Sequence, residues 1–397
     1  MDMDPTAPFT AYGPNRQMEI YRGGLTGRKP LVPVSLAELE QRAKQALLPE
    51  AWDYVAGGAG GEDTVRANRE AYGRWHIVPR MLRDVAQRDL TVELFEQRLP
   101  APVLLAPVGI QGIIHAEAEL AAARAAAALG VPFVLSTLAS KSIEQVAEAA
   151  GSAPRWFQLY PSQDLELTAS MVRRAEQAGY SALVVTVDTM LLGWRERDLD
   201  RHFLPFLGGQ GLANYFTDPV FRSKLAASPE ENPVAAVQYW SEIYSNPSFT
   251  WDDLRRIRRL TRLPLLLKGI LHPDDARLAP KWGVNGIIVS NHGGRQVDGV
   301  MAALDSLPHV VKAVERRIPV LMDSGVRRGA DAFKALALGA RAVLLGRPYI
   351  WGLAVAGEQG VREVLLNFLA DLDLTFALSG YRSCDELSPS ALAEGGA

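Results

Sequence analysis

Between Pro102 and Gly357, short apolar runs alternate eight times with longer stretches of helical composition. The runs are rich in Val, Leu and Ile, as strands buried on both faces are, and several intervening stretches open with Asp or Pro and close with Gly, as helices prefer. A strand followed by a helix, repeated eight times, predicts a closed parallel α/β barrel, the TIM (β/α)8 fold. The expected strands begin at Pro102, Pro132, Arg155, Ala182, Pro264, Gly286, Pro319 and Ala342.

An open, doubly wound sheet is the alternative for alternating strands and helices. It would need a Gly-rich turn directly after its first strand. The dense glycine cluster GGAGGE, which begins at Gly57, lacks the GxGxxG spacing and precedes every expected strand. We therefore expect one domain over residues 1–397, with the barrel at about 102–357 and an N-terminal helical extension at 1–101.

A long insertion separates the fourth and fifth expected strands. Their first residues, Ala182 and Pro264, lie 82 positions apart, which is far more than one crossover helix requires. The extra segment, at about 196–250, contains ANYFTDPVF and VQYWSEIY and is too apolar for a disordered linker. We expect an active-site lid, with Tyr215 as a candidate lid residue, or a packing or subunit-contact loop, and one segment can serve both purposes.

Nearly every expected strand ends in polar residues. In a TIM barrel the binding and catalytic side chains lie at the C-terminal ends of the strands, so polar residues at these places predict a site. The strand-end residues are Ser136, Thr137, Gln158, Tyr160, Thr186, Asp188, Lys268, Asn291, His292, Arg295, Asp323 and Arg347.

Two strand ends carry side chains that a packed core does not explain. Lys268 follows three leucines, and a buried ammonium there requires an anion, either a ligand or a neighbouring carboxylate such as Asp323. His292 is followed by two glycines, which let the backbone approach a ligand, and then by Arg295. Asp188 ends another strand, and a histidine backed by a carboxylate is a typical general base.

The last two strands lead into turns rich in glycine and arginine. DSGVRRGAD follows the seventh strand and LGRPY follows the eighth, where barrels of this kind often bind phosphate at a helix N-terminus. The phosphate could belong to flavin mononucleotide (FMN), to pyridoxal phosphate or to a phosphorylated substrate, and the residues alone leave the three open. With pyridoxal phosphate, Lys268 would be the covalent nucleophile of a Schiff-base lyase.

Charge and composition argue for a small-molecule partner. The 42 basic and 45 acidic side chains give a net charge of −3, which predicts no affinity for nucleic acid or for an anionic membrane surface. No apolar run approaches the ~20 residues of a membrane-spanning helix. Residues 1–17 contain acids and prolines and lack the features of a signal peptide, so we expect a mobile, uncleaved arm and a cytoplasmic protein.

Metal and thiol chemistry are not expected. The sequence has no HExxH motif, no paired cysteines and no closely spaced histidines, so no metal site is predicted. The one cysteine, Cys384, follows the barrel, and no GxSxG nucleophile motif is present. The remaining histidines are interpreted as structural: His76, His115, His202, His272 and His309.

Several of these segments together resemble a known family. From about Tyr21 to Leu387 the chain carries WDYVAGGAGGE, PRWFQLY, LKGI, SNHGGRQ, DSGVRRG and LGRP in order, and in this it resembles the FMN-dependent α-hydroxy-acid oxidases and dehydrogenases. EIYRGGLTG, APVG, LSTLA, NYFTDPVF and ENP are most similar to the lactate 2-monooxygenase members of that family. The resemblance implies a TIM barrel that binds FMN and oxidises a small 2-hydroxy acid with dioxygen.

The resemblance also implies roles for individual residues. His292 would be the catalytic base, Asp188 would support its imidazolium form, and Lys268 would stabilise the reduced flavin. The implied substrate-binding residues are Tyr54, Gly109, Tyr160, Arg195, His292 and Arg295, in which the two arginines suit a carboxylate. The other implied FMN contacts are Pro107, Val108, Gly109, Thr137, Gln158, Thr186, Asp323, Gly325, Arg327, Gly346 and Arg347.

For the reaction, the resemblance implies oxidation of L-lactate, or a close L-2-hydroxy acid, to acetate, carbon dioxide and water. The alternative within the family is an oxidase that releases the 2-keto acid and hydrogen peroxide. A Schiff-base lyase that uses Lys268 and a catalytically idle flavin-binding barrel are more distant alternatives. Gly109 and Leu138 imply a pocket that admits at least a methyl group, which favours lactate over glycolate. The family also implies a homotetramer or homo-octamer.

Overall fold

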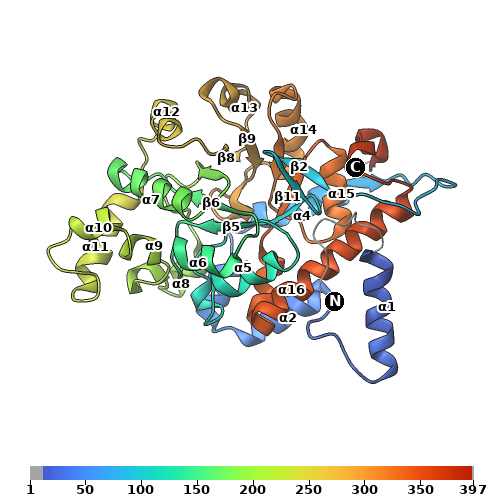
Figure 1. Ribbon diagram of the computed structural model, residues 1–397, viewed down its shortest axis with the longest axis horizontal. Coiled ribbons are helices and arrows are strands. Elements are labelled where there is room, and N and C mark those ends of the chain that lie inside the picture. Colours follow the sequence, from blue (N-terminus) through green and yellow to red (C-terminus); the bar gives the residue numbers. More distant parts are fainter. Residues whose placement is uncertain (1–11, 396–397) are drawn as a thin grey trace.

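The computed structural model describes residues 12–395 and is built around a closed barrel of eight parallel strands (Figure 1). The last barrel strand pairs with the first, Val343 beside Val103 and Leu345 beside Leu105, which closes the barrel. Each apolar run predicted from the sequence holds one strand, so the TIM-barrel prediction is confirmed. The strands are β4 (Val103–Leu105), β5 (Phe133–Ser136), β6 (Arg155–Leu159), β7 (Leu183–Thr186), β8 (Leu265–Ile270), β9 (Gly286–Val289), β10 (Val320–Met322) and β11 (Ala342–Leu345).

Helices follow the strands and surround the barrel (Figure 1). Their first residues carry the expected caps: Ser142 and Gln145 form a capping box at α6, and the Asp164 carboxylate accepts two backbone N–H groups of α7. The last helix, α16, is interrupted at Ala356 and Gly357, close to the predicted end of the barrel. The main helices of the barrel are α5 (Glu119–Ala127), α6 (Ile143–Ala150), α7 (Leu165–Gln177), α12 (Trp251–Leu260), α13 (Pro273–Leu278), α14 (Ala303–Val314), α15 (Gly329–Ala337) and α16 (Arg347–Ser379).

The barrel interior is sealed at the N-terminal ends of the strands by a hairpin. Val92, Leu94 and Leu99 of this hairpin share one buried cluster with inward-facing strand residues such as Leu104 and Trp156. Because this end is filled with apolar side chains, the opposite, C-terminal end is the one that can hold a site. The hairpin consists of β2 (Val92–Leu94) and β3 (Gln97–Leu99).

The N-terminal extension contains helices, as predicted, and also three short strands that the sequence did not suggest. The expectation of a mobile arm at residues 1–17 is wrong for residues 12–17, which belong to α1; residues 1–11 lie outside the described part of the chain. Arg16 of α1 is buried and pairs with Glu363 of α16, which fixes the helix. Besides the hairpin, the extension contains α1 (Tyr12–Leu25), α2 (Leu36–Ala46), α3 (Pro49–Ala56), α4 (Asp63–Arg74) and β1 (Trp75–Ile77). Strand β1 pairs with β12 (Leu392–Glu394).

The insertion between β7 and β8 is folded into short helices, three of which (α9, α10 and α11) form a lobe on one side of the barrel (Figure 1). Phe221 and Trp240 are buried in it, which explains the apolar composition of the segment. The elements of the insertion are α8 (Glu196–Asp200), η2 (Pro205–Gly208), α9 (Ala213–Phe216), α10 (Pro219–Ser223) and α11 (Pro233–Tyr244).

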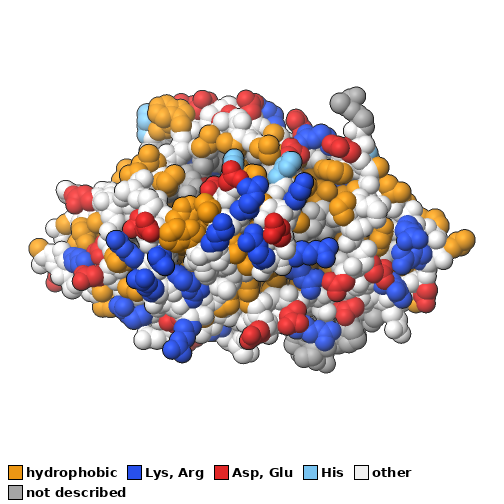
Figure 2. Space-filling view, turned by 90° about the horizontal axis from the view of Figure 1, so that it is seen from above, with side chains coloured by type: hydrophobic (Ala, Val, Ile, Leu, Met, Phe, Trp, Pro, Cys, Tyr) orange, Lys and Arg blue, Asp and Glu red, His pale blue; other side chains and the backbone are white. Residues whose placement is uncertain are grey.

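The surface mixes charges of both signs. Figure 2 shows basic, acidic and hydrophobic side chains interspersed over one face of the molecule. Within residues 12–395, no helix has both the length and the apolar character needed to cross a membrane. Cys384 lies on η5 (Cys384–Glu386), away from the site described below, and burial raises the pKa of its thiol to about 12. This thiol is therefore protonated and unreactive at neutral pH.

Candidate active site

A cavity of about 1020 Å³, its open mouth included, lies at the C-terminal ends of the barrel strands. Loops that follow the strands line it together with α3 of the extension and parts of the insertion. The predicted site residues that line it are Tyr54, Pro107, Val108, Gly109, Tyr160, Arg195, Lys268, His292, Arg295, Asp323, Gly325, Arg327, Gly346 and Arg347. The other four, Thr137, Gln158, Thr186 and Asp188, are largely buried next to these.

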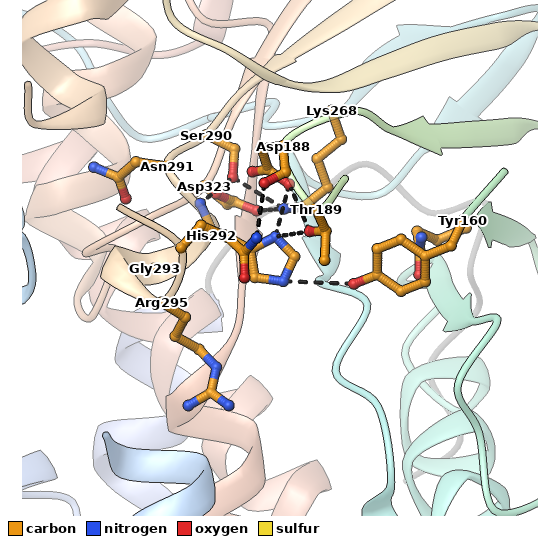
Figure 3. A network of polar contacts seen from close by, with 12 residues as sticks. Tyr160, Asp188, Thr189, Lys268, Ser290, Asn291, His292, Gly293, Arg295 and Asp323 are labelled. Atoms are coloured by element: carbon orange, nitrogen blue, oxygen red, sulfur yellow. Dashed lines mark hydrogen bonds and ion pairs between the residues drawn. The ribbon is translucent and has the colours of Figure 1, made fainter. Parts of the chain in front are cut away.

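His292 and Asp188 form a pair across two strand ends, as predicted (Figure 3). Nδ1 of His292 lies 2.9 Å from Oδ1 of Asp188, and its Nε2 lies 3.5 Å from the Tyr160 hydroxyl. His292 has a φ of 58°, and this left-handed conformation directs the ring into the cavity. Thr189 donates a hydrogen bond of 3.0 Å to the same carboxylate oxygen of Asp188.

The electrostatics of this pair favour a neutral imidazole beside an ionised carboxylate. Burial lowers the pKa of His292 below its usual value, as does Lys268, against the opposing effect of Asp188. Burial opposes ionisation of Asp188, but His292 and Lys268 hold the pKa of its carboxyl below the usual range. Asp188 therefore accepts a hydrogen bond from the Nδ1–H of His292, which leaves a lone pair on Nε2 facing the cavity. A group in this state can remove a proton from a bound hydroxyl.

Lys268 extends from β8 into the same end of the barrel (Figure 3). Its Nζ lies 3.1 Å from Oδ2 of Asp323 and donates a hydrogen bond of 2.9 Å to Ser290. Burial disfavours its charge, but Asp323 and Asp188 hold the pKa of Lys268 above its usual value. The ion pair with Asp323, one of the two explanations that the sequence offered, is thus present, and the ammonium still lines the cavity.

Two arginines lie at the cavity wall formed by α3 and the insertion. Arg295 stacks on the Tyr54 ring, with 4.9 Å between the guanidinium carbon and the ring centroid, and donates to backbone carbonyls of Tyr54 and Gly57. Arg195 donates to the carbonyl of Arg295 and to Gln296. Burial and the neighbouring Arg195 lower the pKa of Arg295 to about 10, so Arg295 remains cationic at neutral pH. Two adjacent buried cations favour an anion, and their planar groups suit a carboxylate.

Buried polar atoms without partners indicate what the cavity wall is built to bind. Within residues 12–395, Gln158 Nε2 and Thr186 Oγ1 are buried and have no hydrogen-bond partner. Unpaired buried polar groups are destabilising unless a ligand or water satisfies them. A donor amide and a hydroxyl suit the polar edge of a flavin ring, which carries both acceptors and a donor. Thr137, by contrast, uses its hydroxyl to bond Gln158 and Tyr160 backbone groups, so it positions the wall.

The backbone at Gly109 is close to the next loop of the wall. A side-chain carbon at this position would meet the carbonyl oxygen of Leu138 at 2.6 Å, so a larger residue would displace one of the two loops. Pro107 and Val108 precede it in the same turn and also line the cavity. The turn therefore presents backbone and a short apolar surface, as a planar ring system requires.

The far end of the cavity gathers cations beside the N-terminus of α16. Arg327 and Arg347 line it, and within the described chain neither has a carboxylate at ion-pair distance. Burial lowers the pKa of Arg327 to about 10 and of Arg347 to about 9, which still leaves both charged at neutral pH. Gly325 has a φ of +89°, and Gly346 caps the N-terminus of α16. This set is suited to a phosphate, as the glycine- and arginine-rich turns predicted.

Two predicted phosphate-end residues have additional roles in the structure. Arg347 donates to backbone carbonyls of Val55, Gly57 and Gly293, so it also ties α3 to the barrel. Asp323 pairs with Lys268 rather than with other residues of the phosphate end.

The insertion contributes side chains that sequence reasoning missed. Phe206 and Tyr244 line the cavity, as does Leu192 from the loop after β7. Tyr215, the predicted lid residue, is wrong as a cavity residue, because it is buried inside the insertion against Phe221. The sequence shows that the insertion is rich in aromatic residues, but composition does not indicate which of these rings face the cavity.

The family of this chain is shown by its similarity to known proteins. The family model described as FMN-dependent dehydrogenase matches residues 43–394. The chain belongs to this family. FMN is therefore its cofactor, and the unpaired polar atoms, the buried lysine and the cationic far end described above fit that molecule.

The relatives of this FMN-dependent dehydrogenase family member act on 2-hydroxy acids. An L-lactate oxidase of Lysinibacillus sphaericus (strain C3-41) is 48% identical over 363 residues, which are 91% of this chain and 93% of that protein. The human 2-hydroxyacid oxidase 1 is 45% identical over 350 residues, 87% and 93% of the two chains. A crystal structure of mandelate oxidase superposes with a TM-score of 0.81 at 39% identity, covering 92% of this chain and 100% of that one.

These findings make the protein an enzyme that oxidises a 2-hydroxy acid with FMN. The alternative function of a Schiff-base lyase is rejected for two reasons. The family uses FMN, and Lys268 is held in its protonated form, which is not nucleophilic. Within residues 12–395, no group of three or more His, Cys, Asp or Glu residues could hold a metal ion.

Proposed function

We propose that the protein oxidises L-lactate, or a close L-2-hydroxy acid, with dioxygen and that it converts L-lactate to acetate, carbon dioxide and water. One observation above all supports a 2-hydroxy acid as the substrate. His292 Nε2 and the Arg195 and Arg295 pair lie in one cavity. A 2-hydroxy acid has one hydroxyl to deprotonate and one carboxylate to bind, and the wall provides one base and one pair of cations.

The roles of the residues follow from their positions. The arginines and the Tyr54 and Tyr160 hydroxyls bind the substrate, and the substrate hydroxyl gives its proton to Nε2 of His292. Asp188 stabilises the resulting imidazolium through the Nδ1 contact of 2.9 Å. Bound FMN supplies the acceptor for the two electrons that leave the substrate. Lys268 contributes a fixed positive charge in the same part of the cavity.

The proposed substrate is short because bulky apolar side chains line the uncharged part of the cavity. Once the hydroxyl and the carboxylate are held, the third substituent of the substrate faces the apolar lining, which includes Leu138, Leu192, Phe206 and Tyr244. A methyl group, as in lactate, needs little room beside these side chains. The high identity to an L-lactate oxidase supports the same substrate.

The fate of dioxygen depends on how long the keto acid stays in the cavity. Pyruvate and hydrogen peroxide, if retained together, react to give acetate, carbon dioxide and water. These products contain all the atoms of one lactate and one dioxygen. The folded insertion, at about 196–250, places aromatic rings in the cavity wall and supports retention as a lid. An oxidase that releases pyruvate and peroxide is the second candidate, and the L-lactate oxidase relatives favour it.

Product analysis separates the two candidates. The purified holoenzyme is incubated with L-lactate in air, with and without catalase, and acetate, pyruvate and peroxide are quantified. We expect acetate in equal yield with and without catalase, because decarboxylation takes place before the peroxide can leave. Pyruvate as the main product in the catalase sample would contradict the proposal and assign an oxidase.

We also propose that the whole chain works as one domain and that it functions in the cytoplasm as a homotetramer or homo-octamer. Exposed apolar side chains close to the cavity support association: Leu191 and Trp194 are 61% and 71% exposed, and Val297 is 60% exposed. Light scattering of the purified protein tests this, and a monomer at micromolar concentration would contradict it.

A further inference from the structure

The insertion connects the two tyrosines of the site through a continuous series of ring contacts. Tyr54 contacts Phe206 with 6.4 Å between ring centroids, and Phe206 contacts Trp240 at 5.2 Å. Trp240 contacts Tyr244 at 4.9 Å, and Tyr244 contacts Tyr160 at 5.8 Å. We call Phe206, Trp240 and Tyr244 the aromatic arc. It spans the cavity from α3 of the extension to the end of β6.

The members of the aromatic arc differ in their access to the cavity. Phe206 and Tyr244 line it, whereas Trp240 is not part of the lining and is only 4% exposed. Trp240 and Tyr244 are four residues apart on α11 and therefore share one helix face. Trp240 thus lies behind the two lining rings and contacts both.

Both ends of the arc are fixed to the rest of the protein. At the α11 end, the carbonyl oxygen of Ile243 accepts hydrogen bonds of 3.0 Å from the Ser162 hydroxyl and from the Gln163 N–H, in the loop after β6 that also contains Tyr160.

At the other end, ion pairs join α8 of the insertion to the extension. Arg201 lies 2.8 Å from Asp53, and Arg197 lies 2.5 Å from Glu62. These contacts hold the first part of the insertion beside α3, which carries Tyr54. The rings of the arc therefore have defined positions in the cavity wall.

We propose that the aromatic arc sets the upper limit on the length of the substrate side chain, and that Trp240 is the positioning residue that holds Phe206 and Tyr244 against the cavity. This inference deepens the proposed function and rests on it for the short 2-hydroxy acid. A longer side chain would have to displace a ring that is packed on both sides, and displacing one ring disturbs its neighbours. Rejection of even one or two extra methylene groups then follows from packing.

The first test removes the two rings of the aromatic arc that line the cavity. Tyr244→Ala and Phe206→Ala are purified with FMN, and kcat/KM is measured as anaerobic flavin reduction with L-lactate, L-2-hydroxybutyrate and L-2-hydroxyhexanoate. We expect the ratio of kcat/KM for 2-hydroxyhexanoate to that for lactate to rise about tenfold or more, since each methylene in a tight pocket changes the ratio by about tenfold. Tyr244→Leu replaces the alanine variant if that variant does not fold.

A control variant shows whether the change in the kcat/KM ratio is specific to the aromatic arc. Phe216 lies in the same insertion and contacts Phe221, but it neither lines the cavity nor belongs to the arc. Phe216→Leu should leave the ratio unchanged. A ratio within twofold of wild type in folded Tyr244 and Phe206 variants would overturn the proposal.

The second test addresses Trp240. Trp240→Leu should raise the same ratio and the KM for lactate, and Trp240→Phe should restore both, because a phenyl ring keeps the contacts with its neighbours. A Trp240→Leu variant that loses only thermal stability, with an unchanged ratio, would overturn the positioning role. Since flavin reduction is measured without dioxygen, this result is independent of whether acetate or pyruvate is the final product.

Discussion

Replacing Asp188 by Asn removes the negative charge beside His292 while keeping the size of the side chain. The Nδ1 and Oδ1 atoms are 2.9 Å apart, and both residues are largely buried. Two unit charges about 4 Å apart attract each other by about 4 kcal/mol at an effective dielectric constant of about 20. This attraction exists only after His292 has taken the proton, so its loss falls on the transition state and corresponds to about a 10³-fold slower reaction.

The asparagine can still accept a hydrogen bond from Nδ1, which is worth about 1 kcal/mol and reduces the expected loss to between about 10² and 10³ fold. The assay is stopped-flow reduction of the flavin by saturating L-lactate without dioxygen. Glu144→Gln is a control, because Glu144 is half exposed and pairs with Arg174 on the outside of the barrel. A reduction rate in Asp188→Asn within threefold of wild type would show that the Asp188 charge does not stabilise protonated His292.

The pH dependence gives a second readout for the same variant. Reduction requires neutral His292, and burial places its pKa below the usual value of 6.5, so wild-type kcat/KM should be lost only as the pH falls below that value. Because Asp188 raises the pKa of His292, its removal lowers that pKa further. The acidic limb of the profile should therefore move to lower pH in Asp188→Asn, and a shift to higher pH would contradict the assignment.

Three further predictions follow from the site. His292→Ala should keep FMN and its visible spectrum but lose flavin reduction by lactate by at least about 10³-fold, as expected for the loss of a base; normal reduction would remove His292 from the mechanism. Lys268→Met leaves Asp323 buried without its ion-pair partner, so FMN affinity should fall at least about tenfold and reduction should slow, as measured by fluorescence titration and stopped flow; an unaffected variant would disprove its role. Removal of FMN should lower the melting temperature in calorimetry, because ligand at about 100 times its Kd stabilises the native state by about 2.7 kcal/mol, and an equal melting temperature of apoprotein and holoenzyme would show that the cavity does not bind FMN as described.

The barrel and the main polar residues were predictable because their signals are local. Nearly every strand is an apolar run followed by a polar residue, and barrel topology brings these ends together. Barrel topology thus makes Asp323 one of the two possible partners of Lys268 and makes Asp188 a possible partner of His292, and both contacts are present.

Other parts of the site depend on contacts that no local pattern records. The hairpin strands β2 and β3 have three residues each, too short for a recognisable alternation. Phe206 and Tyr244 follow no barrel strand directly, and only the packing of the insertion turns them toward the cavity while Tyr215 turns inward. Arg347 was expected at a phosphate, yet its contacts with α3 carbonyls depend on how the extension docks.

The proposed function requires that this cavity, with His292 as its base, passes two electrons from L-lactate to FMN. Anaerobic mixing of the holoenzyme with one equivalent of L-lactate or of D-lactate measures this transfer. We predict loss of the oxidised flavin spectrum with L-lactate, formation of pyruvate in equal amount, and no comparable change with D-lactate. An oxidised spectrum that persists in excess L-lactate would contradict the account.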